Sequence, residues 1–524
     1  MKRWLMRLNA HRAFGDVSAL LAGALLPLAF APFGLAPLAI LSPAILFWLW
    51  IELAPGRSFW RGWLYGLGMF GIGVSWVQIS IHQFGLPVLA FSVTVTVLFI
   101  AFLALYPALL GYLVNRLFPG AHGGVRFFML LPASWTLMEW LRSWLLTGFP
   151  WLNLGYSQID SPLAGIAPVL GVYGVSFAVV LSAGTLCYAW AYPRCLRCLV
   201  LLVPLWGGAW LANRIAWTES FGAEPIEVAL IQGNIPQTLK WLPAQYQATL
   251  DRYLALSAPH WGIDLMIWPE TAIPAFYHPA QPLIQALQAQ VESTGTDLLI
   301  GVPSMGESGK TYYNSVVRIG SAAGFYHKRH LVPFGEYMPL QPIVGRLLNF
   351  LEIPMADFSA GSDAQSLLRV ADQPVGISIC YEDAFGEEVI DTLPHATLLV
   401  NVSNDAWFGD SIAPHQHLEM ARMRALETGR YLLRATNTGI SAVIDRRGTI
   451  MARSPQFEAH ALIAQATPYQ GATPYVRFGN APVVVGLIFM LGLGATLQGI
   501  KRQVRSPQRR IIAVSRKPRR DYLC

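Results

Sequence analysis

Long apolar stretches joined by short loops constrain the fold of this chain more than any other sequence feature. Those of roughly membrane-spanning length lie near residues 15–32, 35–53, 59–79, 87–113, 127–147, 166–191, 196–213 and 480–499. Composition agrees, because 54% of the residues are hydrophobic and only 13% are charged, whereas a soluble protein has about a quarter charged. The sequence therefore predicts an eight-helix transmembrane bundle, with the first helix uncleaved because no small-residue cleavage site follows it.

Most basic residues that flank these stretches lie on one side. They are Lys2, Arg3, Arg7, Arg12, Arg57, Arg61, Arg116, Arg126, Arg194, Arg197 and a dense group after residue 500. The positive-inside rule makes that side cytoplasmic. The predicted division is a seven-helix region at 1–217, a domain outside the cytoplasm at 218–475, an eighth helix at 476–500 and a basic cytoplasmic tail at 501–524. The net charge of +7 then reflects membrane topology, and no nucleic-acid partner is expected.

The segment 218–475 has a different pattern from the rest of the chain. Short apolar runs such as VALIQGNI, DLMIWPE, DLLIGVPS and TLLVNVSND alternate with segments of helical character such as HLEMARMRALETGRYLL. Strands that alternate with helices predict a layered α/β domain. The runs are apolar on both faces, which is typical of strands covered on both sides.

Polar residues follow three of these runs, at the points where the strands should end. They are Glu270 after LMIW, Cys380 after GISI and the group Asn401–Asp405 after LLV. Ligands and catalytic groups in α/β sheets collect beyond the carboxyl ends of strands. A loop rich in Pro and Gly, YHKRHLVPFGEYMPL, adds Lys328 and Glu336.

Together these side chains meet the requirements of a cysteine nucleophile. The thiolate is the attacking species and a free thiol titrates near pH 8.5, so a base or a positive neighbour is needed. Glu270 is expected to take the proton, and Lys328 to stabilise the thiolate and the oxyanion that forms when a carbonyl is attacked. Singly, Cys380 could be an ordinary buried thiol, Glu270 a cap and Lys328 part of a solvated face.

The motifs that carry these residues resemble those of the nitrilase superfamily. WPET contains Glu270, YHKRHLVPFGEYMP contains Lys328, and ICYED contains Cys380; in order, they look like that superfamily's Glu-Lys-Cys triad. The resemblance implies a four-layer αββα sandwich, so the predicted fold class is a nitrilase-like αββα sandwich inserted into the transmembrane bundle.

The membrane half narrows the resemblance to the bacterial apolipoprotein N-acyltransferase family. AFAPFG at 29–34, TGFPWLNLGYSQ at 147–158 and IQGNIPQTLKW, which ends at Trp241, look like that family. The resemblance implies acyl transfer from a phospholipid, with the sn-1 chain of phosphatidylethanolamine expected as donor, through a thioester on Cys380. The acceptor is the N-terminal amine of a diacylglyceryl-cysteine on an apolipoprotein. It also implies the bacterial inner membrane, a periplasmic catalytic domain and a monomer.

The same resemblance implies roles for five supporting residues. Glu336 is expected to orient Lys328 or the amine, and Tyr381 and Glu382 to support the pocket. Trp241 is expected on an arm near the lipid entrance, and Asn314 is expected to help position Lys328. The segments 274–278 (PAFYH) and 349–355 (NFLEIPM) either dip into the membrane or pack as core.

Two other functions remain open from the sequence. A membrane-tethered nitrilase-type amidase would share the triad but would need only one helix as an anchor. A transporter would need ionisable residues along its helices, and few are present. No cofactor and no metal site are expected, because Cys195 and Cys198 lack a second ligand pair and His415 and His417 lie near no acidic or thiol cluster.

Overall fold

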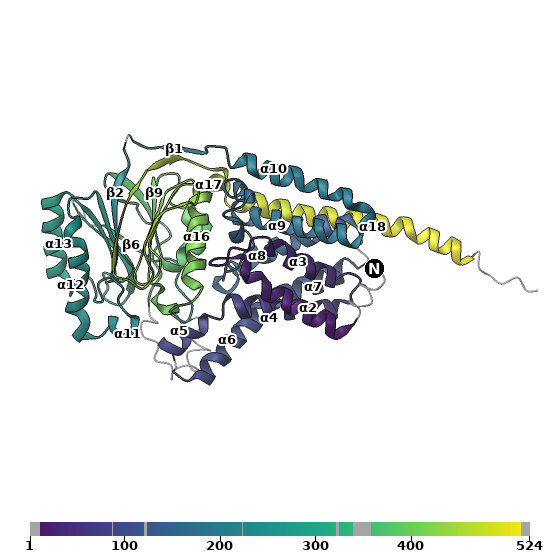
Figure 1. Ribbon diagram of the computed structural model, residues 1–524, viewed down its shortest axis with the longest axis horizontal. Coiled ribbons are helices and arrows are strands. Elements are labelled where there is room, and N and C mark those ends of the chain that lie inside the picture. Colours follow the sequence, from purple (N-terminus) through teal and green to yellow (C-terminus); the bar gives the residue numbers. More distant parts are fainter. Residues whose placement is uncertain are drawn as a thin grey trace, which may run out of the picture.

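A computed structural model describes residues 11–85, 87–119, 123–222, 224–320, 324–338 and 358–514, with side chains described up to residue 498. The segment 349–355 and the side chains of the basic tail thus lie outside the described residues. A bundle of helices forms one end of the molecule, and two β-sheets form the other (Figure 1). The start of α2 and the end of α18 lie at the end away from the sheets.

The helical part has its apolar helices where the sequence predicts them. The bounds are α2 (Arg12–Leu25), α3 (Leu38–Leu49), α4 (Pro55–Gly73), α5 (Val77–Phe84), α6 (Leu89–Leu103), α7 (Leu105–Leu117), α8 (Leu131–Arg142), α9 (Ala167–Ala191), α10 (Leu202–Ala212), α17 (Pro474–Phe478) and α18 (Ala481–Val514). The helix axis bends by 60° between α4 and α5, within the apolar stretch predicted near 59–79.

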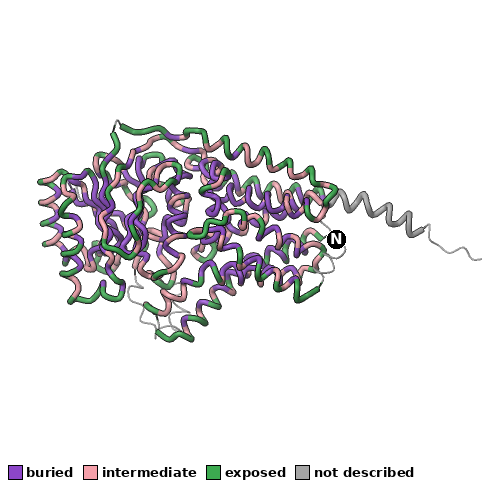
Figure 2. Tube along the Cα trace, viewed as in Figure 1, coloured by how far each residue is buried: buried purple, intermediate pink, exposed green. Residues whose placement is uncertain are grey.

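Five helices of the described chain are long and apolar enough to cross a membrane, or six if the bent pair of α4 and α5 forms one span. The α3 helix is apolar but shorter, at 12 residues. The outer helices α10 and α18 expose large apolar side chains: Val203 is 70% exposed and Phe489 is 71% exposed. Figure 2 shows these outward faces in green and pink around a buried interior. Such apolar surface is unfavourable in water and is typical of helices that contact lipid.

The α/β part contains two six-stranded sheets, a two-stranded sheet of β1 and β14, and several helices. One sheet has the order β12-β11-β10-β9-β8-β7 and the other the order β13-β2-β3-β4-β5-β6. The strand bounds are β1 (Thr218–Ser220), β2 (Ile226–Gln232), β3 (Leu265–Trp268), β4 (Asp297–Met305), β5 (Tyr312–Ile319), β6 (Gly324–His327), β7 (Leu368–Val370), β8 (Gln373–Ile379), β9 (Leu398–Ser403), β10 (Leu432–Thr436), β11 (Ala442–Ile444), β12 (Ile450–Arg453), β13 (His460–Ala466) and β14 (Tyr469–Gly471). The helices are α11 (Gln237–Lys240), α12 (Tyr246–Ser257), α13 (Gln281–Thr294), α15 (Gly386–Ile390) and α16 (Ala413–Thr428).

Three apolar clusters hold these layers together. One contains side chains of both sheets, including Leu230, Ile267 and Val400. A second joins one sheet to α12 and α13, which lie on the outer side of the molecule (Figure 1). The third packs α15 and α16 on the other sheet. Strands β2–β3–β4 and β8–β9–β10 are parallel within their sheets, which aligns their carboxyl ends.

The α16 helix connects the sheets to the helical part. Its residues Met420 and Met423 belong to the same apolar cluster as α3, α4 and α9. Buried carboxylates of α16 also bond the backbone of the helical part. Glu427 accepts a hydrogen bond from the Val172 N–H (2.6 Å), and Glu419 accepts one from the Ala31 N–H (3.2 Å).

Replacing Glu419 by glutamine should stabilise the protein at alkaline pH. Burial raises the pKa of Glu419 to about 8, so between about pH 4.5 and pH 8 the folded state holds a proton that the unfolded state releases. Stability therefore falls as pH rises through this window, by about 1.4 kcal/mol per pH unit at most. Glutamine keeps an acceptor for the Ala31 N–H and carries no charge. In detergent, Glu419→Gln should raise the Tm at pH 8 by on the order of 5 °C and leave it unchanged near pH 4.5.

The exposed Glu307 provides the matched control. Glu307→Gln should leave the Tm unchanged at both pH values. A gain for Glu419→Gln that is equal at pH 4.5 and pH 8 would contradict the proposed cost of charging the buried carboxyl.

Candidate functional site

Cys380 follows β8 directly and begins a short helical turn, Cys380–Ala384. Its φ angle is +52°, a left-handed conformation that is uncommon for a residue other than glycine. The chain thus turns sharply where the sequence predicts the strand to end, and the half-buried Cys380 lies beyond the sheet edge.

Glu270 lies just beyond β3, in the facing sheet. Strand β4 can lie this close to Glu270 because its residue 301 is glycine. A Cβ at Gly301 would lie 2.6 Å from the Glu270 Cα. Asn314 donates a hydrogen bond to Glu270 Oε1 (2.7 Å). The other oxygen, Oε2, is buried and has no hydrogen-bond partner among the described residues. It is therefore available to accept a proton.

Lys328 follows β6, and the main chain and side chains of its neighbours fix its position. Its backbone N–H donates to the Asn314 carbonyl (2.8 Å). Its buried Nζ lies 2.8 Å from Glu336 Oε2 and 3.8 Å from Glu270 Oε1. Asn314 also donates to Glu336 Oε1 (3.0 Å). The structure thus brings Glu270 and Lys328 together with the supporting residues Asn314 and Glu336.

The electrostatic balance favours a charged lysine and a protonated thiol in the resting site. Burial alone would lower the pKa of Lys328, but Glu336 and Glu270 outweigh it and the pKa lies above its ordinary value. Burial raises the pKa of the Cys380 thiol well above its usual range; Glu270 adds to this effect and Lys328 opposes it. A thiol of this kind reacts only when a base removes its proton.

Tyr381 and Glu382 hold the Cys380 turn against its surroundings. Glu382 Oε1 accepts the backbone N–H groups of Arg329 (2.6 Å) and His330 (3.1 Å), and its Oε2 accepts that of Ile379 (2.7 Å). This carboxylate therefore joins the Lys328 loop to the Cys380 turn. The Tyr381 hydroxyl donates to the Gly148 carbonyl (2.8 Å), in the TGFPW motif of the helical part.

The TGFPW motif, 147–151, packs directly on the catalytic half. The Trp151 ring stacks on Tyr381, with ring centroids 5.7 Å apart. His330 bonds the Thr147 carbonyl (3.0 Å), and Gly148 has a φ of +85°, which glycine adopts readily. The helical part therefore contacts the residue next to Cys380.

Trp241 lies at the end of α11 and is 38% exposed. The preceding residue, Lys240, is buried and its Nζ donates to the Glu270 carbonyl (3.2 Å). Burial lowers the pKa of Lys240 to about 8, although Glu270 partly opposes this. Lys240 was not predicted as a site residue, because a lysine between Leu and Trp gives no pattern that distinguishes a buried amine from a surface one.

The prediction that His417 lies near no acidic residues was wrong. No acidic cluster surrounds it along the chain, but in the fold it lies between Asp383 (2.8 Å) and Asp405 (3.0 Å). Arg434 bridges the same two carboxylates, at 3.0 and 3.1 Å. Only the pairing of strands and α16 brings these groups together. Among the described residues, no group of His, Cys, Asp or Glu has an arrangement that could hold a metal ion.

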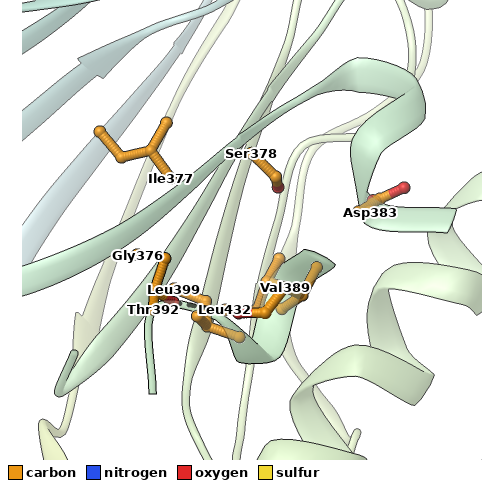
Figure 3. A pocket seen from close by; sticks show the side chains of 8 residues that line it. All are labelled: Gly376, Ile377, Ser378, Asp383, Val389, Thr392, Leu399 and Leu432. Carbon is orange, nitrogen blue, oxygen red and sulfur yellow. Dashed lines mark hydrogen bonds between the residues drawn. The ribbon is translucent and has the colours of Figure 1, made fainter. Parts of the chain in front are cut away.

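The segment 274–278 lies against the core without being part of it, since residues 274–277 are half-buried and His278 is exposed. Tyr277 contacts the cluster between the sheet and α13, and the Phe276 ring lies 5.3 Å from that of Tyr312. A small pocket lies along β8 (Figure 3). Residues of β8, β9 and β10 line it with Asp383, Val389 and Thr392, and none of Glu270, Lys328 and Cys380 belongs to its lining.

Two family models match the chain, one in each half. Residues 22–185 match the model described as "Apolipoprotein N-acyltransferase N-terminal domain", and residues 227–475 match "Carbon-nitrogen hydrolase". The chain is therefore a carbon–nitrogen hydrolase domain joined to several apolar helices. This confirms the nitrilase-like fold that the motifs predict.

Relatives over nearly the full length are named apolipoprotein N-acyltransferase. That of Methylococcus capsulatus is 48% identical over 92% of this chain and 94% of its own. That of Nitrosomonas europaea is 44% identical over 93% and 99%, and that of Pseudomonas aeruginosa is 42% identical over 97% and 99%. The chain belongs to the apolipoprotein N-acyltransferase family, as the sequence resemblance predicts.

Solved structures resemble the catalytic half at low identity. The carbon–nitrogen hydrolase superfamily protein XC1258 from Xanthomonas campestris is 19% identical, with a TM-score of 0.36, and the match covers 50% of this chain and 97% of that one. An amidase from Nesterenkonia sp. is 16% identical, with a TM-score of 0.36 over 50% and 97%.

Proposed function

We propose that this protein transfers an acyl chain from a phospholipid to the N-terminal amine of a diacylglyceryl-cysteine on an apolipoprotein, the last acylation of lipoprotein maturation. The observation that carries the proposal is the Lys328–Glu270 pair (3.8 Å), which acts electrostatically on the Cys380 thiol, in a chain of this family. In addition, the TGFPW motif of the helical part contacts the residue beside the nucleophile. In an amidase the helices would serve only as an anchor.

In the first half-reaction, Glu270 takes the thiol proton of Cys380 through its free Oε2. The thiolate attacks the ester carbonyl of the donor, and the oxyanion that develops is stabilised by the Lys328 ammonium and the Tyr381 backbone N–H. Collapse of this intermediate breaks the ester C–O bond. Glu270 returns the proton to the leaving oxygen, so lysophospholipid departs and a thioester remains on Cys380.

In the second half-reaction, the α-amine of the apolipoprotein attacks the thioester. Glu270 takes the proton that the ammonium must lose before its nitrogen can attack. The same donors stabilise the second oxyanion. As the C–S bond breaks, the nitrogen loses its second proton to the leaving sulfur, which restores the Cys380 thiol and releases the amide product. Glu270 then gives up the first proton to solvent. Glu336 holds Lys328 in place during both steps, and Glu382 and Asn314 position the loop and the carboxylates.

Exposed apolar side chains near the site favour a lipid donor. Leu239, Trp241 and Leu242 are 40%, 38% and 47% exposed, and they flank Lys240, which bonds Glu270. Phe334, close to Glu336 in sequence, is 51% exposed. Each acyl methylene that such side chains cover contributes about 0.8 kcal/mol. We therefore assign these residues to the acyl-chain entrance, with sn-1 phosphatidylethanolamine as the donor.

The proposal includes the arrangement in the membrane. All eight apolar stretches span the bacterial inner membrane in regions 1–217 and 476–500, and the domain 218–475 is a periplasmic αββα sandwich. Both termini, with the tail 501–524, are cytoplasmic, and the protein acts as a monomer without a cofactor. The ion pair of Arg57 with Asp16 (2.7 Å) supports the predicted topology, since it places the starts of α2 and α4 at the same end of the bundle.

Mass spectrometry of the purified protein tests the activity. After incubation with phosphatidylethanolamine in mixed micelles, Cys380 should gain the mass of one acyl chain as a thioester, and hydroxylamine should remove it. Addition of a diacylated lipopeptide should discharge the thioester and produce the N-acylated peptide. If the protein hydrolyses a soluble amide and forms no thioester with phospholipid, the proposal is wrong.

A further inference from the structure

A buried ionic network lies behind the nucleophile and contacts its main chain. Asp383, Asp405, His417 and Arg434 come from four different elements, and each is at most 3% exposed. The His417 Nε2 lies 2.8 Å from Asp383 Oδ1 and 3.1 Å from the carbonyl oxygen of Cys380. The proposed mechanism uses none of these four side chains.

Two donors converge on that one carbonyl oxygen. Besides His417, the buried Asn401 donates to it from Nδ2 (3.3 Å). Asn401 is in turn held by Arg434, whose guanidinium donates to its Oδ1 (2.6 Å). Nε2 of His417 faces two acceptors, so it carries a hydrogen in either charge state of the ring. Nδ1 lies near both an acceptor, Asp405, and a donor, Arg434 (2.8 Å), and so accommodates both states.

This carbonyl belongs to the planar peptide group whose other end is the Tyr381 N–H. In a trans peptide the C=O and N–H bonds point in opposite directions, so a carbonyl fixed on the network side directs the N–H away from it. Hydrogen bonds on a carbonyl also polarise the N–H of the same peptide and strengthen it as a donor. A bond from a group in an ionic network has the larger effect.

We propose that His417 is a positioning residue that, through the Cys380 carbonyl, aims and polarises the Tyr381 N–H as a donor to the oxyanion. This inference rests on the proposed function, in which that N–H stabilises the intermediate. A buried network of this kind costs desolvation energy, and apolar side chains often pack as well in its place. Precise placement of the Tyr381 N–H dipole at the reacting centre explains why the fold contains the network.

The network also contacts the helical part of the molecule, at Trp151. The Trp151 ring lies 5.9 Å from the His417 ring and stacks on Tyr381. Figure 3 shows Asp383 at the edge of the small pocket, with Ser378 directed away from Ile377 across the strand. Asn401 also donates to the Ser378 hydroxyl (3.0 Å), so it fixes the end of β8 as well as the Cys380 carbonyl.

The test compares two reactions of the same thiol, since acylation needs the oxyanion donors and alkylation by iodoacetamide does not. His417→Asn keeps a group near Asp405 but loses the donor to the Cys380 carbonyl. It should slow thioester formation about 10²-fold and change alkylation less than about threefold. His417→Gln, whose amide reaches the Nε2 position, should restore acylation to within about tenfold of the wild type. His415→Asn, on the same helix, should change neither rate.

Asn401→Leu removes the other donor to the same oxygen and should show the same selective loss, which keeps the inference testable if His417→Asn does not fold. Equal losses of acylation and alkylation would mean that the network only packs the turn, and unchanged acylation would also overturn the inference. The acylation assays use two acyl donors, an activated acyl ester and phosphatidylethanolamine. If the wild type is acylated by the activated ester alone, the proposed function fails while the effect of His417 is still measured.

Discussion

Replacing Cys380 by serine should lower acyl transfer to a diacylated lipopeptide by on the order of 10⁴-fold or more. The hydroxyl is a far weaker acid than the thiol, and the buried surroundings that raise the pKa of the Cys380 thiol oppose an alkoxide still more strongly. Loss of the nucleophile in a catalytic group that acts as a unit removes most of the rate enhancement. The measurement is N-acyl peptide formation with phosphatidylethanolamine as donor, together with intact-protein mass.

Serine is nearly the size of cysteine, and both residues experience the same strain at a φ of +52°. The variant should therefore insert into the membrane and have the Tm of the wild type. Cys198→Ser, which changes a half-exposed cysteine away from the site, is the matched control and should retain full transfer. A Cys380→Ser protein with more than about a tenth of the wild-type rate would show that the thiol is not the nucleophile.

Replacing Glu270 by glutamine should slow thioester formation by about 10²- to 10⁴-fold, the range for loss of a general base. Glutamine keeps an oxygen that can accept the Asn314 hydrogen bond (2.7 Å), but it cannot take the Cys380 proton. The raised pKa of the thiol makes the base necessary at neutral pH. Stopped-flow or quenched acylation with an activated ester measures this step directly.

Raising the pH distinguishes the role of Glu270 from a purely structural one. In Glu270→Gln the acylation rate should increase about tenfold per pH unit, because hydroxide must then ionise Cys380. Glu307→Gln, at an exposed position, should behave as the wild type. A Glu270→Gln rate that is low and independent of pH would indicate a collapsed site and would contradict the assignment of Glu270 as the base.

In the membrane part, hydropathy predicts the positions of the helices but not their bends. The positions of the apolar helices were predictable, because a stretch that cannot face water must be helical in lipid. The bend between α4 and α5 was not, since both segments are apolar and the break depends on packing. The Trp407 ring contacts Phe84 and the Phe408 ring contacts Trp76, and these pairs are far apart in the chain.

In the catalytic half, too, some site residues could be predicted from the sequence and others could not. Glu270, Lys328 and Cys380 were identifiable because each stands in a motif at a predicted strand end or loop. Their roles as base, oxyanion donor and nucleophile remain predictions for the experiments above. Lys240 and His417 were missed, since a buried lysine and a histidine on a helix look ordinary until the partners of their nitrogen atoms are known.

The sequence by itself determined which segments are apolar enough for lipid, which alternate as strands and helices, and which family the chain resembles. These properties depend on neighbouring residues and on hydration, so they can be read locally. Only the tertiary structure decided that Tyr381 contacts the TGFPW motif and that two aspartates enclose His417. Those contacts join segments distant in the chain, and their distances follow from how two sheets, α16 and the helical bundle pack together.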